Sequence, residues 1–179
     1  MRAIVVYESM FGNTHAVADA IAAGIGPDAV ALPVAEATRD AVATADLLVV
    51  GAPTHVHGMS RPNTRKWAVD TARKPGASVE LDPAATGPGV REWLGSIGTL
   101  RCSVAAFDTR LHRPGLLTGR AARGISRGLR GHGCAPIAPP ESFFVGADNR
   151  LEAGEADRAR AWGGRLGARA SGTGERAAS

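Results

Sequence analysis

The stretch that decides the fold reads Ile-Val-Val-Tyr-Glu-Ser-Met-Phe-Gly-Asn-Thr-His-Ala-Val-Ala and occupies residues 4–18. An apolar run that ends at Tyr7 predicts a buried strand. The loop that follows holds two hydroxyl side chains, Ser9 and Thr14, and a turn-forming Gly12-Asn13 pair. An amphipathic helix is then expected from about Asn13 to Gly24, so the loop connects a strand to a helix N-terminus.

This loop has the features of an anion site built from neutral groups. Free N–H groups at a helix N-terminus point toward an anion, and the helix dipole adds about half a positive charge there. Hydroxyl groups can donate further hydrogen bonds. No Lys or Arg lies between Arg2 and Arg39. A phosphate at this position would therefore be held by dipoles, without ion pairs.

The loop resembles the phosphate loop of the flavodoxins. In that pattern two apolar residues and an aromatic precede a Ser or Thr, followed by a small residue, a Thr and an Ala at fixed spacing. Here those positions hold Val5, Val6, Tyr7, Ser9, Gly12, Thr14 and Ala18, without departure. Flavodoxins use this loop for the phosphate of FMN, so the resemblance implies that the phosphate is contacted by Ser9, Met10, Phe11, Gly12, Asn13 and Thr14. The alternative is an ordinary strand–helix turn with a Thr near the cap.

Length and composition are those of one globular domain. The 179 residues are 44% apolar and 21% charged, and only 4% are aromatic. We expect a single flavodoxin-like domain over residues 1–170 and a disordered tail over 171–179. No apolar run approaches the roughly 20 residues of a membrane span. The first residues do not follow the signal-peptide pattern, so we expect a cytoplasmic protein.

The chain is basic, with a formal net charge of +4. Its basic residues are almost all arginines, the two lysines being Lys66 and Lys74. No run of five basic residues and no zinc-finger or RNA-binding signature occurs, so the sequence does not indicate nucleic-acid binding. Cys102 and Cys134 are not spaced as a metal pair, and no His, Asp and Glu cluster has metal-ligand spacing. We expect reduced thiols and no metal site.

Apolar runs alternate with helical patterns along the chain, which predicts an α/β fold with a parallel sheet. Five strands are expected near residues 2–7, 29–34, 46–51, 102–108 and 134–145, and helices near 13–24, 39–45, 63–72, 90–97, 118–131 and 153–170. The last strand contains Pro139-Pro140, so it should be a kinked edge strand. This succession resembles the flavodoxin-like doubly wound five-stranded sheet with strand order 2-1-3-4-5. Residues 74–89 should form a long loop.

A second loop after the third strand resembles the flavin-flanking loop of the family. The resemblance implies cofactor contacts from Pro53, Thr54, His55, Val56, His57 and Gly58. Where many relatives stack a Trp or Tyr on the flavin ring, this chain offers His55 or His57. A histidine there could carry a positive charge and raise the flavin potential, or both rings could face solvent. Gly58 matches a family glycine beside which a peptide flips on reduction.

A third loop after the fourth strand corresponds to the one that holds the pyrimidine end of the ring, which implies contacts from Asp108, Thr109 and Arg110. The usual stacking Tyr is missing. A guanidinium at Arg110 could stabilise the anionic reduced flavin, and a solvated loop arginine is the alternative of equal weight.

The resemblance favours an FMN-binding electron-transfer protein that docks a redox partner protein. Arg120, Arg123, Arg127 and Arg130 recur at helical spacing, which would suit an acidic partner, although a solvated helix face explains them as well. An FMN-dependent oxidoreductase of the quinone reductase or protoporphyrinogen-oxidase type is the first alternative, since long loop 74–89 and the missing Trp or Tyr suggest an open pocket. A flavin-free scaffold of the same fold is the second.

Overall fold

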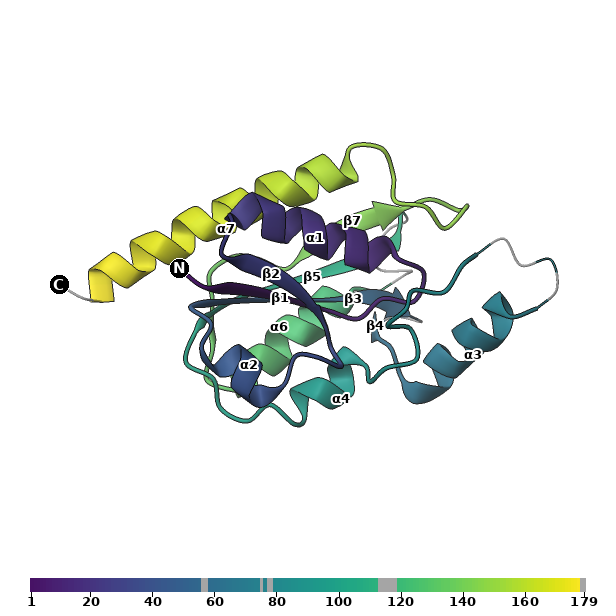
Figure 1. The fold of residues 1–179 in the computed structure, drawn as a ribbon, viewed down its shortest axis with the longest axis horizontal. Coiled ribbons are helices and arrows are strands. Elements are labelled where there is room, and N and C mark those ends of the chain that lie inside the picture. Colours follow the sequence, from purple (N-terminus) through teal and green to yellow (C-terminus); the bar gives the residue numbers. More distant parts are fainter. Residues whose placement is uncertain (56–57, 75, 77–78, 113–118, 178–179) are drawn as a thin grey trace.

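The computed structural model describes residues 1–55, 58–74, 76, 79–112 and 119–177. Within these residues a central sheet is covered by helices on both faces (Figure 1). Its strand order is β2-β1-β3-β5-β6, with β7 also paired to β5 and β4 paired to β3. This is the predicted doubly wound α/β architecture with a flavodoxin-like strand order. The described helices include none long and apolar enough to cross a membrane.

The centre of the sheet is parallel and fully buried. The strands are β1 (Ala3–Tyr7), β2 (Ala29–Pro33), β3 (Leu47–His55), β4 (Gly58–Met59), β5 (Ser103–Leu111), β6 (Ala135–Pro136) and β7 (Glu141–Val145). β1 lies between β2 and β3 in parallel register, with Val5 opposite Ala31 on one side and Val49 on the other. Because both faces of the sheet are covered at its centre, β1 and the first part of β3 are continuous apolar runs without alternation.

The predicted kinked edge strand is present as two short strands. β6 pairs with the start of β5 and β7 pairs with its end, both in parallel. Pro139 and Pro140 lie between them, and neither can donate to a ladder. Together β6 and β7 occupy the place of the fifth strand in the predicted order.

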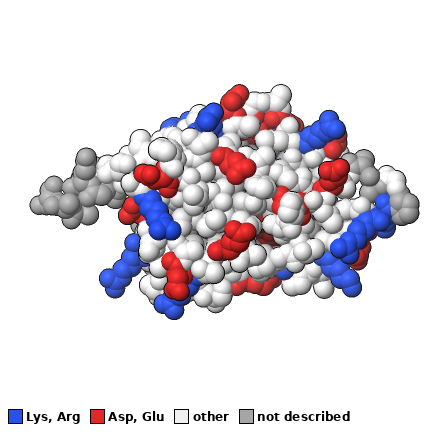
Figure 2. Space-filling model, in the orientation of Figure 1, with Lys and Arg blue, Asp and Glu red and all other residues white. Residues whose placement is uncertain are grey.

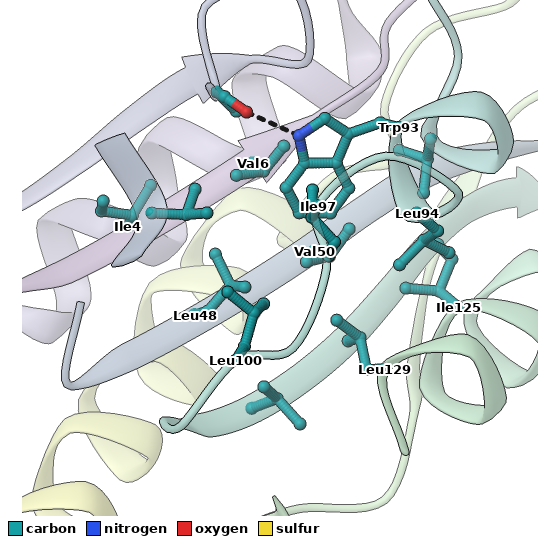
Figure 3. Close-up of a cluster of buried hydrophobic side chains, with 14 of the residues drawn as sticks. Ile4, Val6, Leu48, Val50, Trp93, Leu94, Ile97, Leu100, Ile125 and Leu129 are labelled. Carbon is teal, nitrogen blue, oxygen red and sulfur yellow. Dashed lines mark hydrogen bonds between the residues drawn. The ribbon is translucent and has the colours of Figure 1, made fainter. Parts of the chain in front are cut away.

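The helices form two layers. The described helices are α1 (Asn13–Ile25), α2 (Arg39–Ala43), α3 (Pro62–Ala72), α4 (Val90–Leu94), α6 (Ala121–Gly131) and α7 (Glu155–Ala177), and all but α3 belong to these layers. α1 and α7 lie on one face of the sheet, whereas α2, α4 and α6 lie on the other (Figure 1). On the second face Trp93 is buried among aliphatic side chains, and its indole N–H donates to the Ala37 carbonyl at 2.6 Å (Figure 3).

α1 and α7 approach each other closely through glycines. A Cβ on Gly24 would lie 2.0 Å from the Arg160 carbonyl oxygen, and one on Gly163 would lie 2.2 Å from that of Ile21. No side chain fits at either position without a shift of the helices. These glycines therefore set the separation of the two helices.

Several elements extend beyond their predicted ends. β3 continues to His55 and β5 to Leu111, because their paired register runs on past the point where β1 ends. The segment after β3 was predicted as a loop, but its residues Gly58–Met59 form β4, which pairs antiparallel with the end of β3. α7 continues to Ala177, so residues 171–177 are helical where a disordered tail was expected.

Candidate functional site

A cavity opens at the carboxyl ends of the parallel strands, where the three predicted loops meet. It is lined by Met10, Phe11, Asn13, Thr14, Pro53, Thr54, His55, Thr109, Arg110, Leu111, Val145 and Asn149. In open α/β sheets this edge, between β1 and β3, is the place where ligands bind. Residues far apart in the sequence thus converge on one hollow, and nine of these lining residues were singled out from the sequence.

The first wall of the cavity is the loop between β1 and α1. Gly12 has a positive φ of 85°, which favours glycine, and its N–H donates to Ser9 Oγ at 3.1 Å. The first turn of α1 has no side-chain cap and no acidic residue. Its first N–H groups are thus oriented toward the loop without competition from a cap. This geometry is that of an anion site at a helix N-terminus.

Two side-chain contacts hold this loop against the opposite walls. Thr14 Oγ1 lies 2.7 Å from Thr109 Oγ1, and both residues are buried. The Asn13 side-chain amide donates to the Asn149 carbonyl at 2.9 Å. Asn149 has a positive φ of 59°, so its carbonyl is placed by an uncommon backbone conformation. The loop is therefore joined to β5 and to the segment after β7.

His55 ends β3 at the cavity. Burial lowers the pKa of its imidazole, and the positive charge of Arg65 lowers it further. The lowered pKa favours the uncharged imidazole of His55, and His57, the other histidine considered for a positive charge, lies outside the described residues. The Nε2 of His55 is buried and has no hydrogen-bond partner among the described residues. A neutral imidazole with an unused nitrogen can accept or donate one hydrogen bond.

Arg110 is a buried residue of β5 and does not face solvent. Only 7% of its surface is exposed, and its guanidinium lies 4.9 Å from the centre of the Phe144 ring. Burial lowers the pKa of Arg110, the neighbouring Asp108 raises it, and Arg120 lowers it again. The alternative of a solvated loop arginine is therefore wrong. A guanidinium of this kind is a fixed hydrogen-bond donor at the cavity wall.

β7 is joined to α7 by ion pairs and a hydrogen bond. Arg158 makes ion pairs with Glu141 and Glu155, and its guanidinium lies 4.4 Å from the centre of the Phe143 ring. Glu155 in turn accepts the N–H of Phe144 at 2.6 Å. The strand that carries Phe144, the ring against which Arg110 packs, is thereby joined to α7.

Asp108 and Thr54 are both directed at the N-terminus of α6. Asp108 accepts the Ala122 N–H and Thr54 accepts the Ala121 N–H, each at 2.9 Å. Burial raises the pKa of the Asp108 carboxyl, and the Ala122, Ser142 and Thr54 donors lower it in part. Asp108 does not line the cavity in the described part of the chain. Its position indicates a helix cap below the site.

The remaining predicted site residues differ in position. Ser9 is buried, and its hydroxyl supports the loop from within by accepting the Gly12 N–H. Gly58 pairs with His55 in the β3–β4 hairpin. Val56 and His57, and with them the predicted peptide flip, lie outside the described residues. Sequence reasoning missed Leu111, Val145 and Asn149; the apolar run of β7 could have indicated Val145, but no motif marks the other two.

Pro53 shows why β3 can continue into the cavity wall. β1 ends at Tyr7, and the N–H of the next residue, Glu8, donates to the Gly51 carbonyl of β3 at 3.0 Å. Because alternate residues of a strand face the same neighbour, Pro53 faces the space beyond the end of β1. Its missing N–H therefore removes no sheet hydrogen bond.

The segment around Asp82, which precedes α4, packs against the outer side of the loop between β1 and α1. The Asp82 N–H donates to the Met10 carbonyl at 2.9 Å, and Asp82 Oδ2 lies 3.1 Å from His15 Nδ1. The His15 ring stacks on Tyr7 with centroids 4.4 Å apart. Burial, followed by the charges of Asp82, Asp19 and Glu36, raises the pKa of Tyr7 to about 12, so this phenol stays protonated.

Comparison with known proteins agrees with this architecture. No model of a protein family matches the chain, and no curated protein matches it in sequence. Among solved structures, a flavodoxin from the domain Archaea is 19% identical with a TM-score of 0.62, covering 96% of this chain and 99% of that one. Oxidised Flavodoxin 1 from Bacillus cereus is 16% identical with a TM-score of 0.61, covering 93% and 97%.

A flavodoxin described as a WrbA-like protein from Agrobacterium tumefaciens is also similar, at 19% identity and a TM-score of 0.56, covering 95% of this chain and 97% of that one. In all three structures the similarity extends over nearly the whole of each chain. The chain therefore has the flavodoxin-like fold.

Proposed function

We propose that the protein binds FMN in this cavity and acts in electron transfer. The observation that carries the proposal is the uncapped N-terminus of α1, with Thr14 and Asn13 beside it, at the carboxyl edge between β1 and β3. These neutral donors suit a phosphate ester held without cations. The flavodoxin-like fold of the solved structures supports the same reading.

The donor set fits a flavin mononucleotide along its whole length. Backbone N–H groups of Asn13 and Thr14 and the Thr14 hydroxyl would hold the phosphate, and the Asn13 side-chain amide would fix the loop. Phe11, His55 and Leu111 would contact the ring, with Arg110 at its polar edge. When bound, the flavin supplies reversible one- or two-electron chemistry.

The residues of this chain would bias that chemistry through charge and hydrogen bonding. Arg110 is a buried cation at the cavity, so it would favour a negatively charged state of a bound ring over a neutral one. The lowered pKa of His55 favours its neutral imidazole, whose Nε2 can donate or accept one hydrogen bond. Met10 and Phe11 would limit access of water from the α3 side, where Met10 is almost fully buried.

An FMN-dependent oxidoreductase, of the quinone reductase or protoporphyrinogen-oxidase type, is the second candidate. The observation that favours it is His55, whose unused Nε2 offers a proton donor or acceptor at the cavity. An electron carrier needs no such group.

A visible spectrum recorded during stepwise anaerobic reduction with FMN present tests both candidates. Two resolved one-electron steps support the electron-transfer protein. A single two-electron step supports the oxidoreductase, and assays with quinone and nicotinamide acceptors and donors would follow. If the flavin spectrum does not change on mixing with the protein, both candidates are wrong and a flavin-free scaffold remains.

A further inference from the structure

α3 presents a large aromatic side chain to solvent. Trp67 is 68% exposed, more than any other large apolar residue that the structure describes. The opposite side of the same helix is buried through Ala68 and Val69. Tryptophan supplies extensive apolar contact area and is enriched among the residues that dominate protein–protein interfaces. Its exposure on an ordered helix therefore needs an explanation that the core does not provide.

Basic residues surround this tryptophan. We define the α3 face as the exposed side chains on the outer side of the helix and just after it, namely Lys66, Trp67, Asp70, Arg73 and Lys74. Both lysines of the chain lie in it. Figure 2 shows Lys and Arg side chains at the α3 end of the molecule, and others at the opposite end. The face thus combines an apolar anchor with a net positive charge.

A neighbouring arginine is not part of the α3 face. Arg65 makes an ion pair with Glu92 at 3.0 Å and donates to Ser60 Oγ, so it holds α3 to the body of the protein. This inward contact and the burial of Ala68 fix which side of α3 is outward. The α3 face is therefore presented by a helix whose orientation is set.

The α3 face lies close to the cavity. Ala68 and Val69 form a buried cluster with Met10, and Phe11 packs against it. Met10 and Phe11 also line the cavity. Since a helix with its side chains is about 10–12 Å across, a partner on the outer side of α3 would be separated from the cavity by one helix and the loop beneath it.

We propose that the α3 face docks the acidic surface of a one-electron redox protein, with Trp67 as the apolar anchor. The inference rests on the proposed electron-transfer function and names the kind of partner and its binding surface. One electron would pass between the reduced centre of the partner and the flavin, so that one is oxidised as the other is reduced. Lys66, Arg73 and Lys74 would steer the acidic partner and fix its orientation.

A protein is a better occupant of this face than a nucleic acid. Asp70 lies one helical turn from Trp67, in the middle of the α3 face. Nucleic acids present closely spaced phosphates along their whole length, so an uncompensated carboxylate there would oppose them. The acidic surface of a protein can instead place a donor of its own against Asp70.

The test uses the FMN-loaded protein and a reduced plant-type [2Fe–2S] ferredoxin, which is an acidic one-electron donor. Stopped-flow measurement of flavin reduction gives the second-order rate at low and high ionic strength. We expect Trp67→Ala to slow transfer by roughly tenfold or more, as for an interface anchor. We expect Lys66→Gln and Lys74→Gln to lower the rate and to weaken its dependence on salt.

Matched controls lie far from the α3 face. Arg160→Gln and Arg165→Gln remove the same charge from exposed positions on α7, and Val30→Ala trims an exposed apolar residue on β2. These variants should transfer electrons at the wild-type rate. Calorimetric titration of the same variants with oxidised ferredoxin provides a readout that does not depend on electron transfer, and only the α3 variants should bind more weakly.

The outcomes separate the docking surface from the function on which it rests. If dithionite reduces the bound flavin normally but ferredoxin rates are unchanged in Trp67→Ala, the docking surface is wrong and the function stands. Equal effects from the α7 controls would also overturn it, as would salt-sensitive binding of duplex DNA or self-association through Trp67 without any effect on ferredoxin. If no flavin binds, both proposals are wrong.

Discussion

Thr14 connects the two sides of the cavity through a single hydroxyl contact. Its Oγ1 lies 2.7 Å from Thr109 Oγ1 on β5, and Thr14 also belongs to the first turn of α1. One hydroxyl can donate only one hydrogen bond while accepting others. If Thr14 donates to a phosphate, Thr109 must supply the proton of the bond between them. Phosphate binding and the alignment of α1 with β5 are therefore coupled at this residue.

We expect Thr14→Val to weaken FMN affinity by about 1–3 kcal/mol, the scale of losing a hydrogen bond to a charged group. Valine keeps the shape of the side chain, so the fold should be retained. A titration that follows quenching of FMN fluorescence measures the change. Thr44→Val, at an exposed threonine after α2, is the control. Unchanged affinity in Thr14→Val would mean that the phosphate binds elsewhere.

At the scale of elements, the strand ends and the helix contacts determine the site. The sequence predicted the loop between β1 and α1 because its turn residues and hydroxyls are local signals. It did not predict that β3 and β5 extend into the cavity wall, because that extension depends on pairing with β4 and β7. The contact of Asp82 with Met10 and His15 likewise joins residues about 70 positions apart and has no local signature.

The segment around Asp82 is expected to hold the loop between β1 and α1 in place. Its carboxylate contacts His15 and also accepts the Ala84 N–H at 2.8 Å. Asp82→Ala should make opening of residues 74–89 easier by about 1–3 kcal/mol, the scale of a hydrogen bond to a charged group. Limited trypsin digestion after Arg73 should then be faster; the Lys74–Pro75 bond itself resists trypsin. Glu80→Ala, an exposed change two residues away, should leave the digestion rate unaltered; equal rates in both variants would contradict the bracing role.

The contact between α1 and α7 should be sensitive to a single methyl group. A Cβ on Gly163 would meet the Ile21 carbonyl oxygen at 2.2 Å, whereas one on Gly164 would lie 3.5 Å from that of Gly24. We expect Gly163→Ala to lower the free energy of unfolding by about 1–3 kcal/mol through overpacking. Gly164→Ala should instead raise it by up to about 1 kcal/mol, through helix propensity. Urea unfolding distinguishes them, and similar values would contradict the close approach.

For the whole molecule, buried charge differs between the two ends of the sheet. At the carboxyl ends the fold buries Glu8, Asp108 and Arg110, while the apolar residues below them are packed without charge. The alternation of strands and helices followed from apolar periodicity, which the sequence displays directly, whereas the strand order came from the resemblance to the flavodoxins. The burial of Asp108 and Arg110 depends on how β3, β5 and α6 meet, whereas Glu8 lies against the start of α4 and accepts the Val90 N–H at 2.9 Å. From the sequence alone Asp108 could be placed near a flavin loop, but its role as the cap of α6 could not be recognised.

Asp108 should make the stability of the whole protein depend on pH. Burial raises the pKa of its carboxyl above the ordinary 3.8, so the folded state favours the protonated form. Its contribution is fully present below that value and is lost as the pH rises through the folded pKa. We expect Asp108→Asn, which can still accept the Ala122 N–H, to be more stable than the wild type at neutral pH and to lack this decline. Urea unfolding between about pH 4 and 8 measures both effects, with Asp157→Asn at an exposed position as the control. Parallel plots of the free energy of unfolding against pH for the wild type and Asp108→Asn would show that Asp108 is ionised in the folded protein without cost.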